Sequence, residues 1–419
     1  MHAAIITFGY PPIKHVSGTR PGNLAGQLAH LGHAVTVVTV DWSTRENPPP
    51  ESAGVLLLAI DPRAWVPGFT PATPPFTTEP PFLGPSALRR ARTLQRTLRW
   101  GPYESWARAA LRELLARHRI SPIDVVWAIH GDDSSHEIAY RFSRETGVPW
   151  VADFKDPWDL FHKRAVVWLQ ELVTRRRLRG AAALTETCKA QSDTDAARFH
   201  LPAHVLWTGY EADLMERAAP ERLSGEAFVL AYVGNLAELH DVDAVARLFA
   251  AWEALPSRPA KVELHAFCND ASALKRRLEA RGVLHYLHEH GFVTRERAYG
   301  IMKGADALLL LPATHHHPSG GSIGVKELEY LASGTPVLSI GKLLSELDPV
   351  TRGCPQLIEA EGAAAAATWL LAEAATPGRS RAEVNRPSVV AHSWPAKGLA
   401  LAAILEGVSC GGDPRRSGS

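Results

Sequence analysis

A glycine-rich stretch near residue 320 carries residues whose types and spacing suit a diphosphate. The stretch Pro318–Ile340 reads PSGGSIGVKELEYLASGTPVLSI, which predicts a glycine loop, a short helix, a turn and a buried strand. Glycines let the backbone approach a ligand, and the free N–H groups at a helix start bind anions. Lys326 adds a cation in the first helical turn, and Glu329, on the same helix face, can accept hydrogen bonds from a ribose. On these residues alone, an ordinary strand–helix crossover is an equally good interpretation.

Two predicted strands in the first half of the chain end in polar residues. His130 follows the strand Val125–Ile129, and Asp153 and Asp156 lie at the end of the strand Trp150–Asp153. Doubly wound α/β proteins place their chemistry at the carboxyl ends of such strands. We therefore take these three residues as catalytic candidates. The two carboxylates would serve the acceptor, and the alternative is that they only brace the loop. The alternative for the histidine is a packing role.

Two motifs resemble those of a known family. G-V-K-E-L-E-Y-L-A-S-G-T-P-V-L resembles the K-x-x-E-Y-L-A-x-G-x-P-V element of GT-B glycosyltransferases, in particular the retaining group called family 4. V-A-D-F-K-D-P-W resembles the D-F-R-D-P-W signature of a bacterial subgroup of that family, with Lys155 in place of arginine. The resemblance implies that Glu329 binds the ribose of a sugar nucleotide, that the glycine loop and helix start hold its diphosphate, and that His130 lies near the donor sugar.

The sequence departs from the family pattern at two places. An earlier glutamate of many members falls at Gly321, and an arginine and a lysine of the second domain are replaced by Asn235 and His240. The phosphate role therefore stays with the helix start and Lys326. The segment around Gly18 resembles the opening of the family, which implies that this glycine lies near the ligand rather than in a plain turn. The predicted donor-binding residues are Gly18, Gly234, Asn235, Ser319, Gly320, Gly321, Ser322, Gly324, Lys326 and Glu329.

Two successive series of apolar strands and helical patterns must position these residues. A strand over 3–8, a helix to about residue 31 and a strand over 34–39 form a βαβ start, and a second series begins at residue 228. We predict an α/β protein of the GT-B class, with two doubly wound Rossmann-like domains facing a central cleft. The first domain spans 1–207, a linker 208–227 and the second domain 228–385. The resemblance implies that the second domain binds the nucleotide-sugar and that residues 386–419 form a helix that crosses back, followed by a tail.

Composition narrows the class of protein. The 419 residues are 46% hydrophobic and 21% charged, with a net charge of +1, which indicates a globular protein and gives no reason to invoke nucleic acid. The four cysteines are scattered and form no C-x-x-C pair, so neither a zinc site nor a disulfide framework is indicated. We find no signal-peptide core and no apolar run approaching the ~18 residues needed to span a bilayer, and we expect a cytoplasmic protein.

Three further segments bear on the acceptor. A proline-rich segment from Asp61 to Pro85 predicts an irregular insertion, which either shapes an acceptor pocket or is passive decoration. The arginine-rich helix expected over Ser86–His118 suits an anionic acceptor or peripheral membrane contact, although a solvated face is the commoner explanation. The triplet His315, His316 and His317 is interpreted as part of a loop near the donor, because adjacent histidines cannot easily converge on one metal.

The resemblance implies a glycosyltransferase that moves a sugar from a nucleotide diphosphate-sugar to a small-molecule or glycan acceptor with retention. It implies no cofactor and no catalytic metal, because fixed amides and cations stabilise the leaving diphosphate. Two alternatives stay open: a GT-B sugar-nucleotide epimerase, which has no separate acceptor, and a noncatalytic nucleotide-sugar binding subunit. The K-x-x-E-Y-L-A and D-F-K-D-P-W elements favour transfer.

Overall fold

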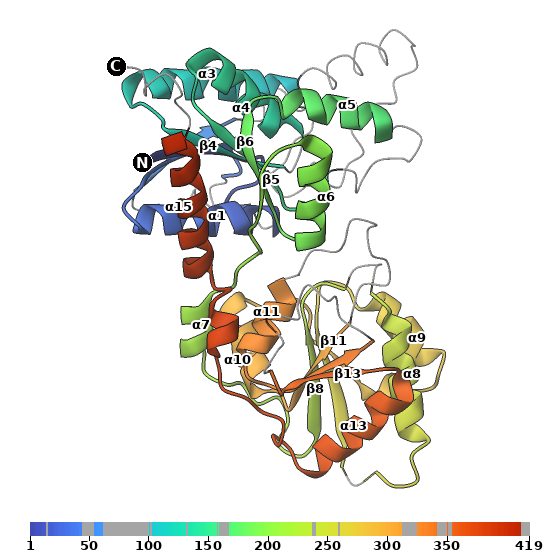
Figure 1. Ribbon diagram of the computed structural model, residues 1–419. Coiled ribbons are helices and arrows are strands. Elements are labelled where there is room, and N and C mark those ends of the chain that lie inside the picture. The colour runs from blue at the N-terminus through green and yellow to red at the C-terminus, as the bar shows by residue number, and fades with distance from the viewer. Residues whose placement is uncertain are drawn as a thin grey trace. The chain divides into compact units, whose positions relative to one another are not determined.

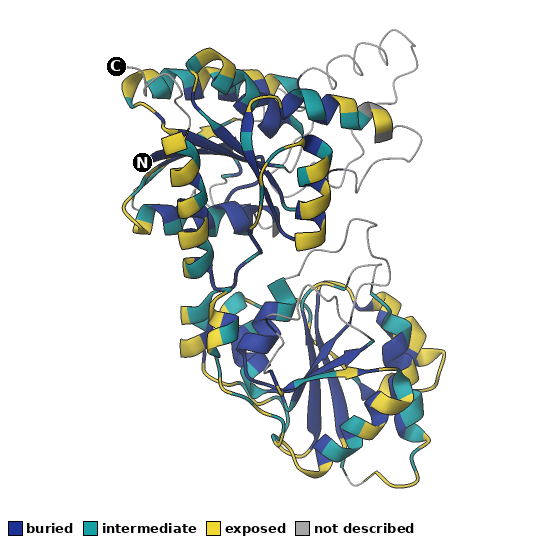
Figure 2. Cartoon of the chain, in the orientation of Figure 1, coloured by how far each residue is buried: buried dark blue, intermediate teal, exposed yellow. Residues whose placement is uncertain are grey.

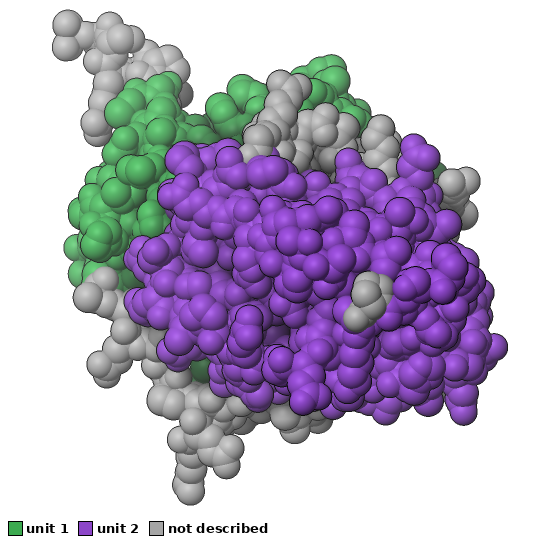
Figure 3. Space-filling model, turned by 90° about the horizontal axis from the view of Figure 1, so that it is seen from below, with its two compact units in different colours: residues 1–207, 394–419 green, residues 208–393 purple. Residues whose placement is uncertain are grey.

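The chain divides into two compact units. The computed structural model describes residues 1–13, 16–43, 54–61, 100, 103–130, 133–156, 158, 167–236, 240–258, 260–311, 325–341, 350 and 354–411. Unit 1 comprises Met1–Trp207 and Trp394–Ser419, and unit 2 comprises Thr208–Ser393 (Figure 3). Each unit is built around one parallel sheet with helices on its faces (Figure 1).

Unit 1 contains a seven-stranded parallel sheet in the order β3-β2-β1-β4-β5-β6-β7. Its strands are β1 (His2–Ile6), β2 (Ala34–Val40), β3 (Val55–Ile60), β4 (Val125–Ile129), β5 (Trp150–Phe154), β6 (Ala181–Glu186) and β7 (Ala203–Val205). Every residue of β1, β4 and β5 is buried, as expected for strands that are covered on both faces (Figure 2).

Helices cover both faces of this sheet. They are α1 (Val16–His30), α3 (Glu104–Ile120), α4 (Asp133–Thr146), α5 (Val167–Arg177), α6 (Lys189–Phe199) and α15 (Trp394–Gly411). Trp106 of α3 and Ile138 of α4 pack on one face, whereas Leu24 of α1 and Leu401 of α15 pack on the other. The C-terminal helix α15 therefore returns to the first unit, as the family resemblance implied.

Unit 2 contains a six-stranded parallel sheet in the order β10-β9-β8-β11-β12-β13. Its strands are β8 (Phe228–Val233), β9 (Val262–Phe267), β10 (Leu287–Glu289), β11 (Ala307–Leu310), β12 (Val337–Ile340) and β13 (Leu357–Ala360). The helices are α7 (Ala212–Arg217), α8 (Val242–Glu253), α9 (Ser272–Glu279), η3 (Leu284–Tyr286), α10 (Arg295–Gly304), α11 (Val325–Ala332), α13 (Ala363–Ala375) and α14 (Pro387–Val390). Trp252 of α8, Leu274 of α9 and Leu370 of α13 pack on one face.

Both sheets have the strand order of a Rossmann fold, with the chain reversing its direction of growth beside the first strand of each unit. In such sheets, ligands bind at this switch point, beyond the carboxyl ends of the strands. The switch point lies between β1 and β4 in unit 1 and between β8 and β11 in unit 2. The two separate parallel sheets confirm the predicted pair of doubly wound Rossmann-like domains.

The structure also differs from the sequence-based expectations. Strand β3 was not predicted, because its apolar run lies between proline-rich segments; it forms the edge of the sheet and is only partly buried. A helix was expected over Ser86–His118, whereas α3 begins at Glu104 and residues 86–99 lie outside the described residues. The predicted linker 208–227 contains the helix α7. Among the described helices, none is long and apolar enough to cross a membrane.

Candidate functional site

The switch point of unit 2 brings together three residues predicted to bind the donor. Gly234 directly follows β8 with a φ of 130°, and a Cβ at this position would lie 2.8 Å from Cε of Lys326. Any larger residue would therefore displace the lysine. Lys326 Nζ donates hydrogen bonds to the Tyr232 hydroxyl at 2.5 Å and to the Asn235 carbonyl at 3.3 Å. The lysine thus lies across the turn that follows β8.

The charge of Lys326 is only partly compensated by the protein. Burial lowers the pKa of Lys326 to about 8, although Glu327 and Glu329 oppose this shift. The ammonium also lies 4.3 Å from the centre of the Tyr232 ring, where a cation–π contact holds it. A cation whose charge is disfavoured by burial gains energy when an anion binds beside it. The arrangement therefore suits a phosphate group.

Glu329 is held in a fixed orientation by two donors from α10. Its Oε1 accepts from Nη1 of Arg295 at 2.7 Å and from the Tyr299 hydroxyl at 2.8 Å. Burial raises the pKa of Glu329, and Arg295 and Tyr299 counteract part of that shift. The next residue of α11, Tyr330, has a hydroxyl that accepts from the Val233 N–H at 2.8 Å and donates to the Val233 carbonyl at 3.1 Å. These two hydrogen bonds fix α11 to β8. A carboxylate placed in this way can accept hydrogen bonds without reorganising.

Arg295 and Tyr299 were missed by the sequence analysis. They lie four residues apart at the start of α10, so that both face α11. The i,i+4 spacing of a cation and a tyrosine was visible in the sequence, but their common partner Glu329 lies 34 and 30 residues away along the chain. The other members of the predicted stretch, Ser319, Gly320, Gly321, Ser322 and Gly324, lie outside the described residues.

In unit 1, Gly18 lies in the first turn of α1. A Cβ at Gly18 would lie 2.6 Å from Cγ2 of Ile13 and 3.3 Å from the carbonyl carbon of Tyr10. The loop therefore folds back onto the helix start, and this close approach by itself accounts for a glycine. Contact between Gly18 and the donor stays a prediction.

Asp153 forms a fully buried ion pair. Its Oδ1 accepts from Nη2 of Arg20 and from the Thr185 hydroxyl, both at 2.7 Å, and its Oδ2 accepts from Nε of Arg20 at 3.2 Å. Asp153 is 0% exposed and Arg20 is 4% exposed. Asp156, by contrast, is 40% exposed and lies 3.9 Å from Nζ of Lys155. In this geometry Asp153 braces the sheet, while the side chain of Asp156 is accessible; acceptor roles for both stay predictions.

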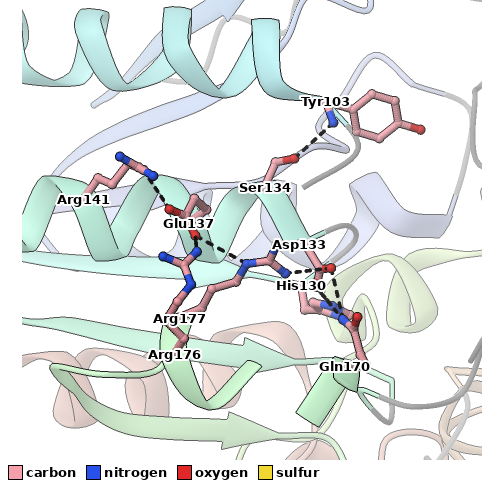
Figure 4. A network of polar contacts seen from close by, with 9 residues as sticks. All are labelled: Tyr103, His130, Asp133, Ser134, Glu137, Arg141, Gln170, Arg176 and Arg177. Carbon is pink, nitrogen blue, oxygen red and sulfur yellow. Dashed lines mark hydrogen bonds and ion pairs between the residues drawn. The ribbon is translucent and has the colours of Figure 1, made fainter. Parts of the chain in front are cut away.

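His130 lies at the end of a network of charged side chains (Figure 4). Its Nε2 lies 3.5 Å from Oδ1 of Asp133, whose Oδ2 lies 2.7 Å from Nη1 of Arg177. Gln170 Nε2 also donates to Asp133, at 3.1 Å to Oδ2. Burial would raise the pKa of Asp133, but Arg177 and His130 lower it, so that it lies well below its usual value. The carboxylate beside His130 is therefore ionised at neutral pH.

On its other side, Arg177 is held by the carboxylate of Glu137. Arg177 is 1% exposed, and its Nε lies 3.4 Å from Oε2 of the fully buried Glu137. Glu137 also accepts from Nε of Arg141 at 2.7 Å and from Nη2 of Arg176. His136, which directly precedes Glu137 in α4, donates from Nε2 to the Ala128 carbonyl at 3.1 Å, and burial lowers its pKa to about 3, as expected for a packing residue. Its neighbour His130 is 18% exposed.

No protein-family model and no curated protein sequence matches this chain. Solved structures do match. Sucrose-phosphate synthase of Thermosynechococcus elongatus superposes with a TM-score of 0.64 at 14% identity, over 98% of this chain and 99% of that one. An α,α-trehalose-phosphate synthase (UDP-forming) from Burkholderia vietnamiensis superposes with a TM-score of 0.61 at 14% identity, over 98% of this chain and 99% of that one. HepE of Anabaena in complex with UDP superposes with a TM-score of 0.60 at 11% identity, over 97% of this chain and 99% of that one. At these identities the likeness shows the fold, which is that of GT-B glycosyltransferases.

Proposed function

We propose that this protein is a glycosyltransferase that uses a nucleotide diphosphate-sugar donor. The observation that supports it most strongly is the pair Lys326 and Glu329, which lie on α11 at the switch point of unit 2. Similar structures include a synthase described as UDP-forming and HepE in complex with UDP, so UDP is our leading carrier and GDP the alternative. In the proposed complex, Lys326 contacts the diphosphate and Glu329 accepts hydrogen bonds from the ribose.

The geometry of Lys326 also bears on a missing family residue. Asn235 stands where many family members carry an arginine after the first strand of this domain. Lys326 Nζ reaches the Asn235 carbonyl, so a cation is present at this turn although the arginine is absent. This supports a donor site at this turn, which a transferase and a noncatalytic binding subunit would share.

We further propose that transfer proceeds with retention and without a catalytic metal. The negative charge that develops on the leaving diphosphate would be stabilised by the Lys326 ammonium and by fixed amides at the start of α11. The leaving phosphate can take the acceptor proton. His130 would orient the sugar or stabilise its charge, and the exposed Asp156 would position the acceptor. We infer a cytoplasmic enzyme with a soluble small molecule as its acceptor, and a glycan as the alternative.

Replacing Glu329 by alanine is expected to weaken binding of a nucleoside diphosphate-sugar roughly ten- to hundred-fold. The reason is that loss of a charge-assisted hydrogen bond in a buried site typically costs about 1.5–3 kcal/mol. Isothermal titration calorimetry with UDP- and GDP-sugars would measure the change. Glu221→Ala is the matched control, because Glu221 pairs with Arg297 of the same helix α10 but on an exposed face. Equal affinities of wild type and Glu329→Ala would refute the ribose assignment.

The affinity for UDP is expected to fall about tenfold between pH 7 and pH 9. With a pKa of about 8 in the free protein, Lys326 loses its charge over this range, whereas a bound diphosphate keeps it protonated. Calorimetry at several pH values would test this. Lys326→Arg keeps its charge throughout and should show a nearly flat profile, so a wild-type profile as flat as that of the arginine variant would contradict a Lys326–diphosphate contact.

A further inference from the structure

Two neighbouring strands at the edge of the unit 2 sheet carry a group of histidines and a glutamate. Glu263 and His265 alternate with core residues along β9 and therefore point to the face opposite that core. His288 of the edge strand β10 lies directly opposite His265 in the parallel register. One oxygen of Glu263 and one ring nitrogen each of His265 and His288 lie within 4.8 Å of one another. Glu263 and His265 are buried, and His288 is exposed.

The contacts of His265 orient its ring between two partners. Its Nε2 lies 3.1 Å from Oε2 of Glu263, and its Nδ1 lies 2.9 Å from Nε2 of His290. The rings of His288 and His290 stack against the His265 ring, with centroids 4.8 and 5.0 Å away. Lys261 Nζ lies 2.6 Å from the other carboxylate oxygen of Glu263 and is itself 68% exposed. The oxygen nearest His265 is thus separate from the one that pairs with the lysine.

The two buried groups, Glu263 and His265, are in the forms that metal ions bind. Lys261 lowers the pKa of Glu263 to about 2, with further lowering from His265. Burial lowers the pKa values of His265 and His290, so both imidazoles are neutral at pH 7. A neutral imidazole and an ionised carboxylate are the forms that bind metal ions.

We propose that Glu263, His265 and His288 bind one divalent transition-metal ion, with Zn²⁺ as the expected occupant, and that the ion links the edge strand β10 to β9. Two histidines and one carboxylate are an established zinc ligand set, which leaves a fourth position for water. His265 would bind through Nε2, while its Nδ1–H donates to Nε2 of His290, the outer-shell bond that orients most metal-binding histidines. The exposed side chain of His288 completes the site and gives the ion a path from solvent.

The proposed ion belongs to the stability of unit 2 and not to glycosyl transfer. The site shares no residue with Lys326, Glu329 or their hydrogen-bond partners. Strand β10 is three residues long and has a neighbour on one side alone in the described sheet. A bond from each of two strands to one ion would hold this short edge strand in register. Metal binding at this site therefore does not depend on the proposed glycosyl transfer.

Zinc binding to the untagged full chain tests the proposal. The background is a variant with His315, His316 and His317 replaced by alanine, which removes the histidine triplet as a competing ligand. Competition with a chromogenic chelator should give one Zn²⁺ per chain, and Co²⁺ should give the intense visible absorption of a four-coordinate site. Zn²⁺ should also slow hydrogen exchange of the β10 amides.

Variants identify the ligands. His288→Ala and Glu263→Gln should each weaken Zn²⁺ binding by about 100-fold or more, since even outer-shell changes cost 10- to 100-fold. His285→Ala is the matched control, because His285 is an exposed histidine three residues before His288 that lies beside Glu253. His288 is exposed and Glu263→Gln preserves shape, so both variants should fold. Absence of stoichiometric binding in the triplet-replaced background, or unchanged affinity in both ligand variants, would overturn the proposal.

Discussion

Replacing Asp153 by alanine is expected to lower the free energy of unfolding of unit 1 by about 3–5 kcal/mol. Removal of one partner of a buried ion pair leaves the other charge in the interior without compensation, and this is among the most destabilising single changes. The charge left behind is Arg20, which is 4% exposed and otherwise donates to the Trp207 carbonyl at 3.4 Å. Thr185 would lose its acceptor at the same time.

Urea denaturation followed by tryptophan fluorescence would measure this loss. Trp127 is a local reporter, because its Nε1 donates to the Thr185 hydroxyl at 3.0 Å and its ring lies 5.7 Å from the Arg20 guanidinium. Asp156→Ala is the matched control in the same motif; at 40% exposure it should change stability by no more than about 0.5 kcal/mol. Similar stabilities of the two variants would show that Asp153 does not brace the sheet.

Replacing His130 by alanine is expected to lower kcat by ~10²-fold or more, the effect typical of a positioned catalytic group. The structural basis is the fixed carboxylate of Asp133, which lies 3.5 Å from Nε2 of His130 and is itself held by Arg177. Such a partner orients an imidazole. Because the side chain is partly exposed, its loss should affect turnover much more than stability.

Steady-state kinetics of sugar transfer, together with melting temperatures, would separate these two effects. His204→Ala is a suitable control, since His204 is an exposed histidine of the same sheet, on β7. Normal turnover by His130→Ala would reduce His130 to a packing residue. The proposed mechanism would also fail if NMR showed an inverted anomeric configuration in the product.

The alternation of apolar strands and amphipathic helices was enough to predict two Rossmann-like domains, because buried parallel strands read as continuous apolar runs. Strand β3 escaped notice because its run, VLLLAI, lies at the sheet edge between prolines. The return of α15 to unit 1 came from the resemblance. Periodicity alone could not have placed this helix, since its buried residues contact α1 and β4, which are more than 250 residues away in the sequence.

The candidate site was predictable where its residues are neighbours in the sequence and not where they meet through the fold. Lys326 and Glu329 belong to one helical motif and were found. Arg295 became meaningful only when α10 was seen to face α11. The same holds for Arg177, which lies in a basic run of the kind usually explained by solvation. Its actual partners, Asp133 and Glu137, lie on a different helix, and the burial of Arg177 follows from how α5 docks on α4.

The central claim is that this chain transfers a sugar from a nucleotide donor to an acceptor. Its most direct test is incubation of the purified protein with UDP- and GDP-sugars and a panel of soluble acceptors, with products identified by chromatography and mass spectrometry. The account predicts an acceptor whose mass increases by one sugar residue, together with release of nucleoside diphosphate in equal amount. Conversion of the donor to an isomer with no acceptor consumed, or donor that is bound but left intact with every acceptor, would contradict it.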